Sequence, residues 1–321
     1  MRRSLMALCD IFMENKAVLK NTFKWHDAEL YSACAAIFID QRRIADKEKL
    51  LEMKTLLKSR FGIFSDYRGN AEMAILSYLS ILDDPKDALK RTEKLYQAMK
   101  KQFRWSSNLT LPCLILTNIM PIRKYVSTAK TAREIYDCMN KKHPVLTTSS
   151  DAMFCVLMTM LNDPPLIMVE HAEELYQKLV ALRVFPSKDA VQSLANLLLF
   201  VDGDPDEKVK RVYRIHQSLR EEGRKYDDWH GLPTIGVLAM LPEEIDDLVK
   251  EVYEVDAYLA EQKEYKGIFG ISKGTRLVDA AMLVCSDHIG TADNLVFTFA
   301  QLVGILQLVA QRQAAAAAAA A

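Results

Sequence analysis

Residues 85–120, PKDALKRTEKLYQAMKKQFRWSSNLTLPCLILTNIM, decide how the chain folds. The first half is highly charged, carries apolar residues at helical spacing, and begins with a proline, which suits the first turn of a helix. The second half, LPCLILTNIM from Leu111, is almost wholly apolar. The stretch therefore predicts a helical hairpin with an amphipathic outer helix and an apolar inner helix.

The same pattern recurs about every forty residues. Five prolines stand 36, 43, 41 and 37 residues apart, and five tyrosines of the outer helices 40, 40, 37 and 40 apart (Pro85, Pro121, Pro164, Pro205, Pro242; Tyr96, Tyr136, Tyr176, Tyr213, Tyr253). This periodicity predicts a single helical-repeat domain over 1–321. It contains about seven hairpins and a final helix at 291–313 that caps the stack, with hairpins at 5–45, 46–84, 85–120, 121–163, 164–204, 205–241 and 242–289.

The predicted fold class is all-α. With 11 Gly and 10 Pro in 321 residues, the chain lacks the turn residues that an all-β fold needs. The hairpins could stack as an open α-solenoid or close into an α/α toroid, and the sequence is compatible with both.

Charge and cysteine usage restrict the partners and the compartment. Lys+Arg 42 balances Asp+Glu 42, which argues against general nucleic-acid binding. The six cysteines form no C-x-x-C pair and lie in apolar runs, as reduced buried thiols do. No secretory signal is recognisable at the N-terminus. We expect a cytoplasmic protein.

The C-terminal stretch 294–311, NLVFTFAQLVGILQLVAQ, carries no charge. Its asparagine, threonine and glutamines favour a buried capping helix over a transmembrane span. Peripheral membrane attachment through 294–313 is the alternative. No chemistry is inferred from the alanine run 314–321.

Two buried polar residues are candidate catalytic groups. His216 and Asp256 both lie within hydrophobic stripes of outer helices, three positions after a tyrosine, in a column with Met99, Met139 and Leu179. Adjacent repeats would bring the pair together, and a carboxylate orients and activates a histidine as a general base. Mutual structural pairing is the alternative interpretation.

Two further groups of residues are candidate binding sites. Tryptophan, histidine and aspartate open two inner helices, and at one rim they could bind a ligand, with His26 and His230 as candidate metal ligands; helix capping is the alternative (Trp25, His26, Asp27; Asp228, Trp229, His230). Lys273, Thr275 and Arg276 open the last inner helix, where backbone amides and cations attract an anion.

No nucleophile, dinucleotide or P-loop motif is present. The sequence therefore favours a non-enzymatic scaffold that binds a peptide, a protein or a small ligand, as a monomer or a homo-oligomer, without a cofactor. The alternative is an α/α-toroid or metal-dependent enzyme that uses inner-rim histidines and acids, including Glu72, Asp151, Asp189 and Asp279.

Three short motifs resemble a bacterial family of uncharacterised proteins, domain-of-unknown-function family 4003. They are Phe23-Lys-Trp-His-Asp27, Gly62-Ile-Phe-Ser65 with Arg68-Gly-Asn70, and Phe269-Gly-Ile271 with Arg276-Leu277. The resemblance implies a cytoplasmic helical protein and brings no activity or ligand. The outer helices also resemble pentatricopeptide repeats, but the period is nearer 40 than 35 residues and no regular base-reading pair is present.

Overall fold

A computed structural model describes residues 1–24, 28–39, 41–69, 71–104, 109–148, 151–226, 231–266 and 271–289. These residues form fourteen α-helices and four short 3-10 helices, and no strand is found among them. The predicted all-α class is confirmed. The predicted final helix at 291–313 lies outside the described residues.

The helices fall into two compact units. Unit 2 holds the described residues within 21–24 and 45–170, and it contains three helix pairs: α3 (Lys47–Arg60) with α4 (Glu72–Ser80), α5 (Pro85–Gln102) with α6 (Thr110–Ile119), and α7 (Tyr125–Lys142) with α8 (Asp151–Met158). The 3-10 helices η1 (Asp66–Arg68), η2 (Ile122–Lys124) and η3 (Thr159–Leu161) lie in its connections.

Unit 1 holds the described residues within 1–20, 25–44 and 171–304. Its pairs are α1 (Arg3–Thr22) with α2 (Ala28–Ile39), α9 (Pro165–Ala181) with α10 (Lys188–Leu198), α11 (Pro205–Glu221) with α12 (Gly231–Ala239), and α13 (Ile245–Ala260) with α14 (Lys273–Ile289). Helix α9 begins in unit 2, and η4 (Lys263–Tyr265) connects α13 to α14.

Local signals explain where the outer helices begin. Pro85 and Pro205 are the first residues of α5 and α11. The Asp84 carboxylate accepts from the Asp87 amide at 2.9 Å, and Asp204 caps Asp206 and Glu207 at 2.9 and 3.3 Å. These caps satisfy amides that the first helical turn leaves without partners.

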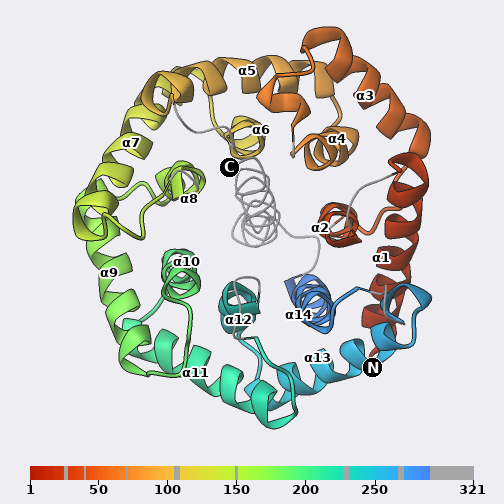
Figure 1. The fold of residues 1–321 in the computed structure, drawn as a ribbon, viewed down its shortest axis with the longest axis vertical. Helices are drawn as coiled ribbons and strands as arrows, with labels where there is room; N and C mark the ends of the chain where they lie inside the picture. The colour runs from red at the N-terminus through yellow and green to blue at the C-terminus, as the bar shows by residue number, and fades with distance from the viewer. Residues whose placement is uncertain are drawn as a thin grey trace, which may run out of the picture. The chain divides into compact units, whose positions relative to one another are not determined.

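The two helices of a pair differ in burial as their hydropathy predicts. The outer helix buries one face, and in α5 this face is Ala88, Leu89, Thr92, Leu95, Tyr96 and Met99. The inner helix is buried all round: every residue of α12 is buried, and so are the nine consecutive residues from Ala190 to Leu198 in α10. In each unit the inner helices pack on one another as one layer and the outer helices form a second (Figure 1).

The first and the last described helix pairs meet inside unit 1. Helix α2 packs on α14, and α1 is tied to α13 and α14 by polar contacts (Figure 1). The N-terminal amine lies 2.7 Å from Glu254, Arg2 lies 2.8 Å from Glu251, and the Ser4 hydroxyl donates to Asp287 at 2.9 Å. The first helix pair therefore stands beside the pair α13–α14, more than 240 residues later in the chain.

Within the described residues, no single helix has the length and apolarity to cross a membrane. One bent pair passes that test by length and composition, with 113° between Asp151–Leu161 and Pro165–Ala181.

The cysteines are expected to be inert in the folded chain. All six are free thiols, five are buried, and only Cys138 is partly exposed. Burial raises the pKa of Cys9 to about 12. A thiol-reactive chromophore should therefore label Cys138 first under native conditions and all six only after unfolding. Rapid native labelling of several thiols would contradict the buried assignment.

Candidate functional site

Several predicted site residues lie outside the described part of the chain. They are Trp25, His26, Asp27, Asp228, Trp229 and His230, and they include both candidate metal ligands. Within the described residues, no group of three or more His, Cys, Asp or Glu side chains is arranged to hold a metal ion.

Six of the seven described outer helices, all except α3, share a buried position at a spacing of forty residues or twice that. The buried positions 92, 95, 96 and 99 of α5 recur forty residues apart in α7, α9, α11 and α13, and eighty residues earlier in α1. We call the third of these positions the outer-helix column. Its members are Lys16, Tyr96, Tyr136, Tyr176, His216 and Asp256.

The alignment of α11 and α13 with the earlier outer helices that the tyrosine spacing predicts is therefore wrong by three residues. His216 and Asp256 are equivalent to Tyr96, not to Met99, and Leu219 and Leu259 take the methionine position. Tyr213 and Tyr253 lie one helical turn earlier and are not buried, with Tyr253 43% exposed. Equivalent positions of the repeats are therefore defined by which helix face is buried, and not by where a tyrosine recurs in the sequence.

Column residues pack on the connection that follows the outer helix of the preceding pair. The Tyr96 ring meets Tyr67 at 5.3 Å, Tyr136 meets Phe103 at 5.9 Å, and His216 meets Phe185 at 5.0 Å, all edge-on. The two charged members, Asp256 and Lys16, contact the corresponding connections after α11 and α13. The column thus joins successive helix pairs.

Asp256 is held between two guanidinium groups. Its carboxylate is 3.1 Å from Arg224 and 2.7 Å from Arg276, and the residue is 2% exposed. Arg224 also lies over the Tyr253 ring, 4.0 Å from its centroid. His216 is buried against Phe185 instead. Arg224 and Arg276 thus engage both carboxylate oxygens of Asp256, whereas the ring contact of His216 is with Phe185.

The candidate anion-binding residues already face protein acceptors. Lys273 donates to the Gly223 carbonyl at 3.3 Å, Thr275 donates to Glu29 at 2.9 Å, and Arg276 donates to Asp256. An incoming anion would have to displace two carboxylates and a carbonyl, so this arrangement does not support the predicted anion site.

A second buried polar cluster surrounds Lys16, which sequence reasoning missed. The Lys16 amine donates to the Tyr265 hydroxyl at 2.8 Å and lies 3.5 Å from Glu264 and 4.0 Å from Asp279. Tyr265 and Ser32 both donate to Asp279, at 2.6 and 2.9 Å. Five residues from α1, α2, η4 and α14 thus form one network, which we call the Lys16 cluster.

Burial controls the ionisation of the Lys16 cluster. Lys16 is 1% exposed, and its desolvation lowers the pKa of the amine below 10.5, although Asp279 and Glu264 oppose the shift. Desolvation also raises the pKa of Tyr265 and of Asp279. A lysine, a tyrosine and an aspartate with shifted pKa values could exchange protons, but the cluster is buried in protein, so its evident role is to fasten α1 and α2 to α14.

The pH dependence of stability tests this ionisation. Because burial raises the pKa of Asp279 above its ordinary 3.8, the folded chain retains this proton to higher pH than the unfolded chain does. Its contribution to stability is present below about pH 4 and is lost as the pH rises through the folded pKa. The difference in free energy of unfolding, wild type minus Asp279→Asn, should therefore fall as the pH rises above about 4. A constant or rising difference in urea unfolding would contradict the burial argument.

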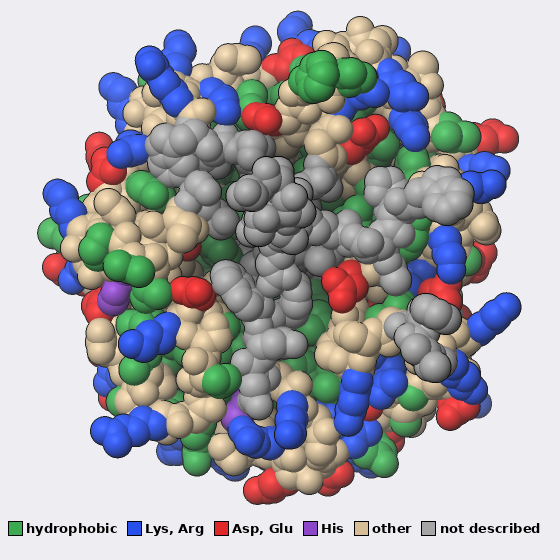
Figure 2. Space-filling model, viewed as in Figure 1, with side chains coloured by type: hydrophobic (Ala, Val, Ile, Leu, Met, Phe, Trp, Pro, Cys, Tyr) green, Lys and Arg blue, Asp and Glu red, His purple; other side chains and the backbone are tan. Residues whose placement is uncertain are grey.

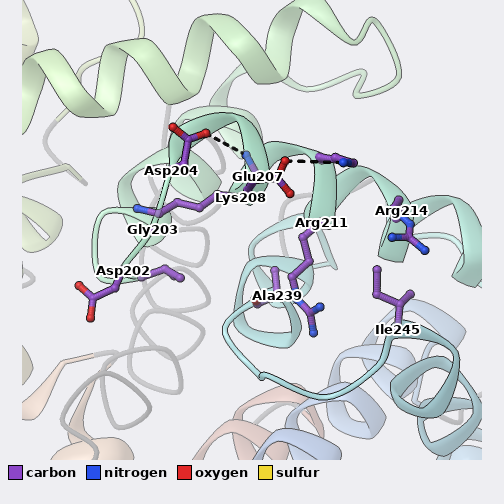
Figure 3. A pocket seen from close by; sticks show the side chains of 11 residues that line it. Asp202, Gly203, Asp204, Glu207, Lys208, Arg211, Arg214, Ala239 and Ile245 are labelled. Atoms are coloured by element: carbon purple, nitrogen blue, oxygen red, sulfur yellow. Dashed lines mark hydrogen bonds and ion pairs between the residues drawn. The ribbon is translucent and has the colours of Figure 1, made fainter.

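One surface hollow of about 270 Å³ lies at the start of α11. The basic side chains of the hollow donate to backbone carbonyls at and after the ends of inner helices. Arg211 donates to the carbonyls of Ala239, Leu241 and Glu243 at 3.1, 2.5 and 2.6 Å. Lys208 donates to the Leu198 carbonyl at 3.3 Å. Figure 3 shows Arg211 directed toward α12. The hollow therefore reflects capping of inner helices.

The C-terminal ends of α3, α5 and α7 form a surface with a distinct composition, which we call the basic edge. Three large apolar side chains in its connections are strongly exposed: Phe64 at 96%, Val145 at 88% and Ile63 at 66%. The last turns of the same helices and their connections also carry basic residues: Lys58, Arg60, Arg68, Lys100, Lys101, Arg104, Lys141 and Lys142. Figure 2 shows Lys and Arg side chains over these helices, with hydrophobic ones among them.

Comparison with known proteins gives a family without an assigned activity. The family model described as "Protein of unknown function (DUF4003)" matches residues 15–314. A relative from Bacillus subtilis (strain 168), "Uncharacterized protein YeaA", is 26% identical over 315 residues, covering 94% of this chain and 91% of the relative. No solved structure matches. The resemblance seen in the sequence is confirmed, and the chain belongs to the DUF4003 family of proteins of unknown function.

Proposed function

We propose that this protein is a non-enzymatic cytoplasmic scaffold that uses the basic edge of unit 2 to bind a macromolecular partner. The observation that carries the proposal is Phe64, an aromatic side chain 96% exposed on a connection whose backbone is held in place. Together with Ile63 it exposes apolar surface on a connection that begins just after the basic residues Lys58 and Arg60, and exposed apolar surface rimmed by polar residues marks interaction sites.

The enzymatic alternative has less support. Asp256 is engaged by two arginines, and Lys16 and Asp279 are buried in a network of their own. These pairs explain Asp256, Lys16 and Asp279 as links between helix pairs of unit 1.

For the arrangement of the hairpins, we propose the closed toroid over the open solenoid. Support comes from unit 1, where α1 and α2 pack beside α13 and α14. The ends of an open solenoid would be far apart. Small-angle scattering from the full chain distinguishes the two, because an open solenoid has the larger radius of gyration.

Site-specific photo-crosslinking tests the binding surface. A photoreactive amino acid replaces Phe64 or Val145 in living bacteria, and the matched control carries it at Leu166, an exposed apolar residue of unit 2 at the start of α9. We expect adducts at 64 and 145 in excess of those at 166, and their loss when Lys100 and Lys101 are changed to Glu. Equal yields of adducts at all three positions, or yields that are unchanged in the Lys100→Glu/Lys101→Glu variant, would overturn the proposal.

A further inference from the structure

The residue composition of the basic edge also indicates which class of partner it binds. This inference rests on the function proposed above. We infer that the basic edge docks on an anionic lipid bilayer, with Phe64, Ile63 and Val145 entering the headgroup region and the surrounding lysines and arginines facing lipid phosphates.

The Phe64 tip is pre-organised. Beneath it, the rings of Phe61 and Tyr67 stack at 4.0 Å, and Arg68 donates to the Phe61 carbonyl at 3.3 Å. The Ser65 amide donates to Gly62, at 3.1 Å, and the Arg68 amide donates to Ser65, at 2.8 Å. The backbone is therefore fixed while the Phe64 ring points into solvent, and insertion into another phase requires little ordering.

Side-chain contacts link the C-terminal ends of α3, α5 and α7. Arg60 at the end of α3 forms two bonds to Glu93 of α5, at 2.5 and 2.6 Å, and Tyr96 of α5 donates to Asp66 of η1. Arg133 of α7 donates to the Gln102 carbonyl at the end of α5, at 3.3 Å. These contacts hold the ends of the three helices next to one another, and the exposed apolar residues and the lysines lie at those ends.

The edge holds more basic residues than acidic partners: Glu93 pairs with Arg60 and Asp66 with Lys100, and the other six basic residues are Lys58, Arg68, Lys101, Arg104, Lys141 and Lys142. Asp66 accepts from Tyr96 and lies 3.6 Å from Lys100, and Asp137 pairs with Arg133 at 2.7 Å. Both charged residues at the end of each of α5 and α7 are lysines, Lys100 with Lys101 and Lys141 with Lys142. A cytoplasmic leaflet rich in anionic lipid attracts such a surface.

The apolar content fits a bilayer better than a protein or a nucleic acid. Among the described residues of the edge, the strongly exposed apolar side chains are three on two connections, which falls far short of the roughly 800 Å² per partner that stable protein interfaces bury. Isoleucine and valine tips give no stacking platform for bases. A few apolar tips flanked by long cations suit interfacial attachment, in which acyl chains receive the tips and phosphates receive the charges.

Vesicle flotation with the full chain tests the inference. The probes are vesicles of phosphatidylcholine alone and of phosphatidylcholine with an equal part of phosphatidylglycerol. We expect binding only to the anionic vesicles, a loss of about tenfold in Phe64→Ser from lost apolar transfer, and a loss of tenfold or more in Lys100→Glu/Lys101→Glu, roughly that of two cations. Binding should also weaken as salt rises from about 0.1 M to about 0.5 M.

Matched controls come from the same unit. Leu166→Ser removes an exposed apolar side chain away from the edge, and Lys86→Glu/Lys90→Glu reverses two charges in the first half of α5. Both should bind anionic vesicles as the wild type does.

Equal binding to the two vesicle types, or equal losses in controls and edge variants, would overturn the inference. If vesicles fail while charge-dependent crosslinks to a protein persist at position 64, scaffold binding stands and the lipid partner is wrong; if the crosslinks fail too, both proposals are wrong.

Discussion

Lys16→Met is expected to lower the free energy of unfolding by about 3 kcal/mol, because removal of one partner leaves the other charges of a buried network uncompensated. Lys16 is 1% exposed and is the single cation of the Lys16 cluster, where it contacts Tyr265, Glu264 and Asp279. These contacts join α1 to η4 and α14, so hydrogen exchange should show the loss of protection first in α1. Urea unfolding followed by circular dichroism measures the change.

Two further variants isolate the buried charge. Lys20→Met removes an exposed lysine four residues further along α1 and should change stability by less than about 0.5 kcal/mol. Lys16→Met/Asp279→Asn removes both charges, so it should lose less than the sum of the single variants, with a coupling of about 1 to 3 kcal/mol. Additive losses would show that Lys16 and Asp279 act independently, and wild-type stability in Lys16→Met would refute the fastening role.

The sequence predicted the local structure of this chain because local signals specify it. Pro85 and Pro205 open α5 and α11 after capping aspartates, and the apolar runs at Val191 and Leu232 became helices buried on every side. The packing of α1 on α13 and α14 was not predictable in the same way. Contacts such as Arg2 with Glu251 join residues 249 positions apart, and no periodicity within a helix encodes them.

The site was harder to predict for two physical reasons. Tyr213 and Tyr253 continue the letter pattern of the earlier repeats but lie one helical turn from the buried column, so matching residue types gave the wrong register. The residue type does not predict that Lys16 is buried, because a lone lysine in an amphipathic helix usually faces solvent. The signal was present: its flanking apolar residues Phe12 and Leu19 have the spacing of the column, eighty residues before Tyr96.

The exchange of tyrosine for charged residues in the column has an energetic consequence in unit 1. A tyrosine at this position packs on the ring of the preceding connection, as Tyr136 does on Phe103. In α13 and α1 the same position holds Asp256 and Lys16, and the partners are Arg224 and Tyr265. Charged partners require matching geometry, so these two junctions depend on specific side chains more than the aromatic junctions do.

Asp256→Ala is accordingly expected to lower the free energy of unfolding by about 2 kcal/mol, less than Lys16→Met because its partners retain some solvent. The Arg224 and Arg276 side chains are 17% and 15% exposed, and without the carboxylate their guanidinium groups face each other uncompensated. Asp256→Asn keeps the shape and one acceptor but no charge, so its loss of stability should be intermediate.

Asp246→Ala, at an exposed position in the first turn of α13, should lower the free energy of unfolding by no more than about 1 kcal/mol. Equal losses in Asp256→Ala and Asp246→Ala would mean that the column position contributes no more than any helix-end carboxylate, and the junction between α11 and α13 would then rest on apolar packing alone.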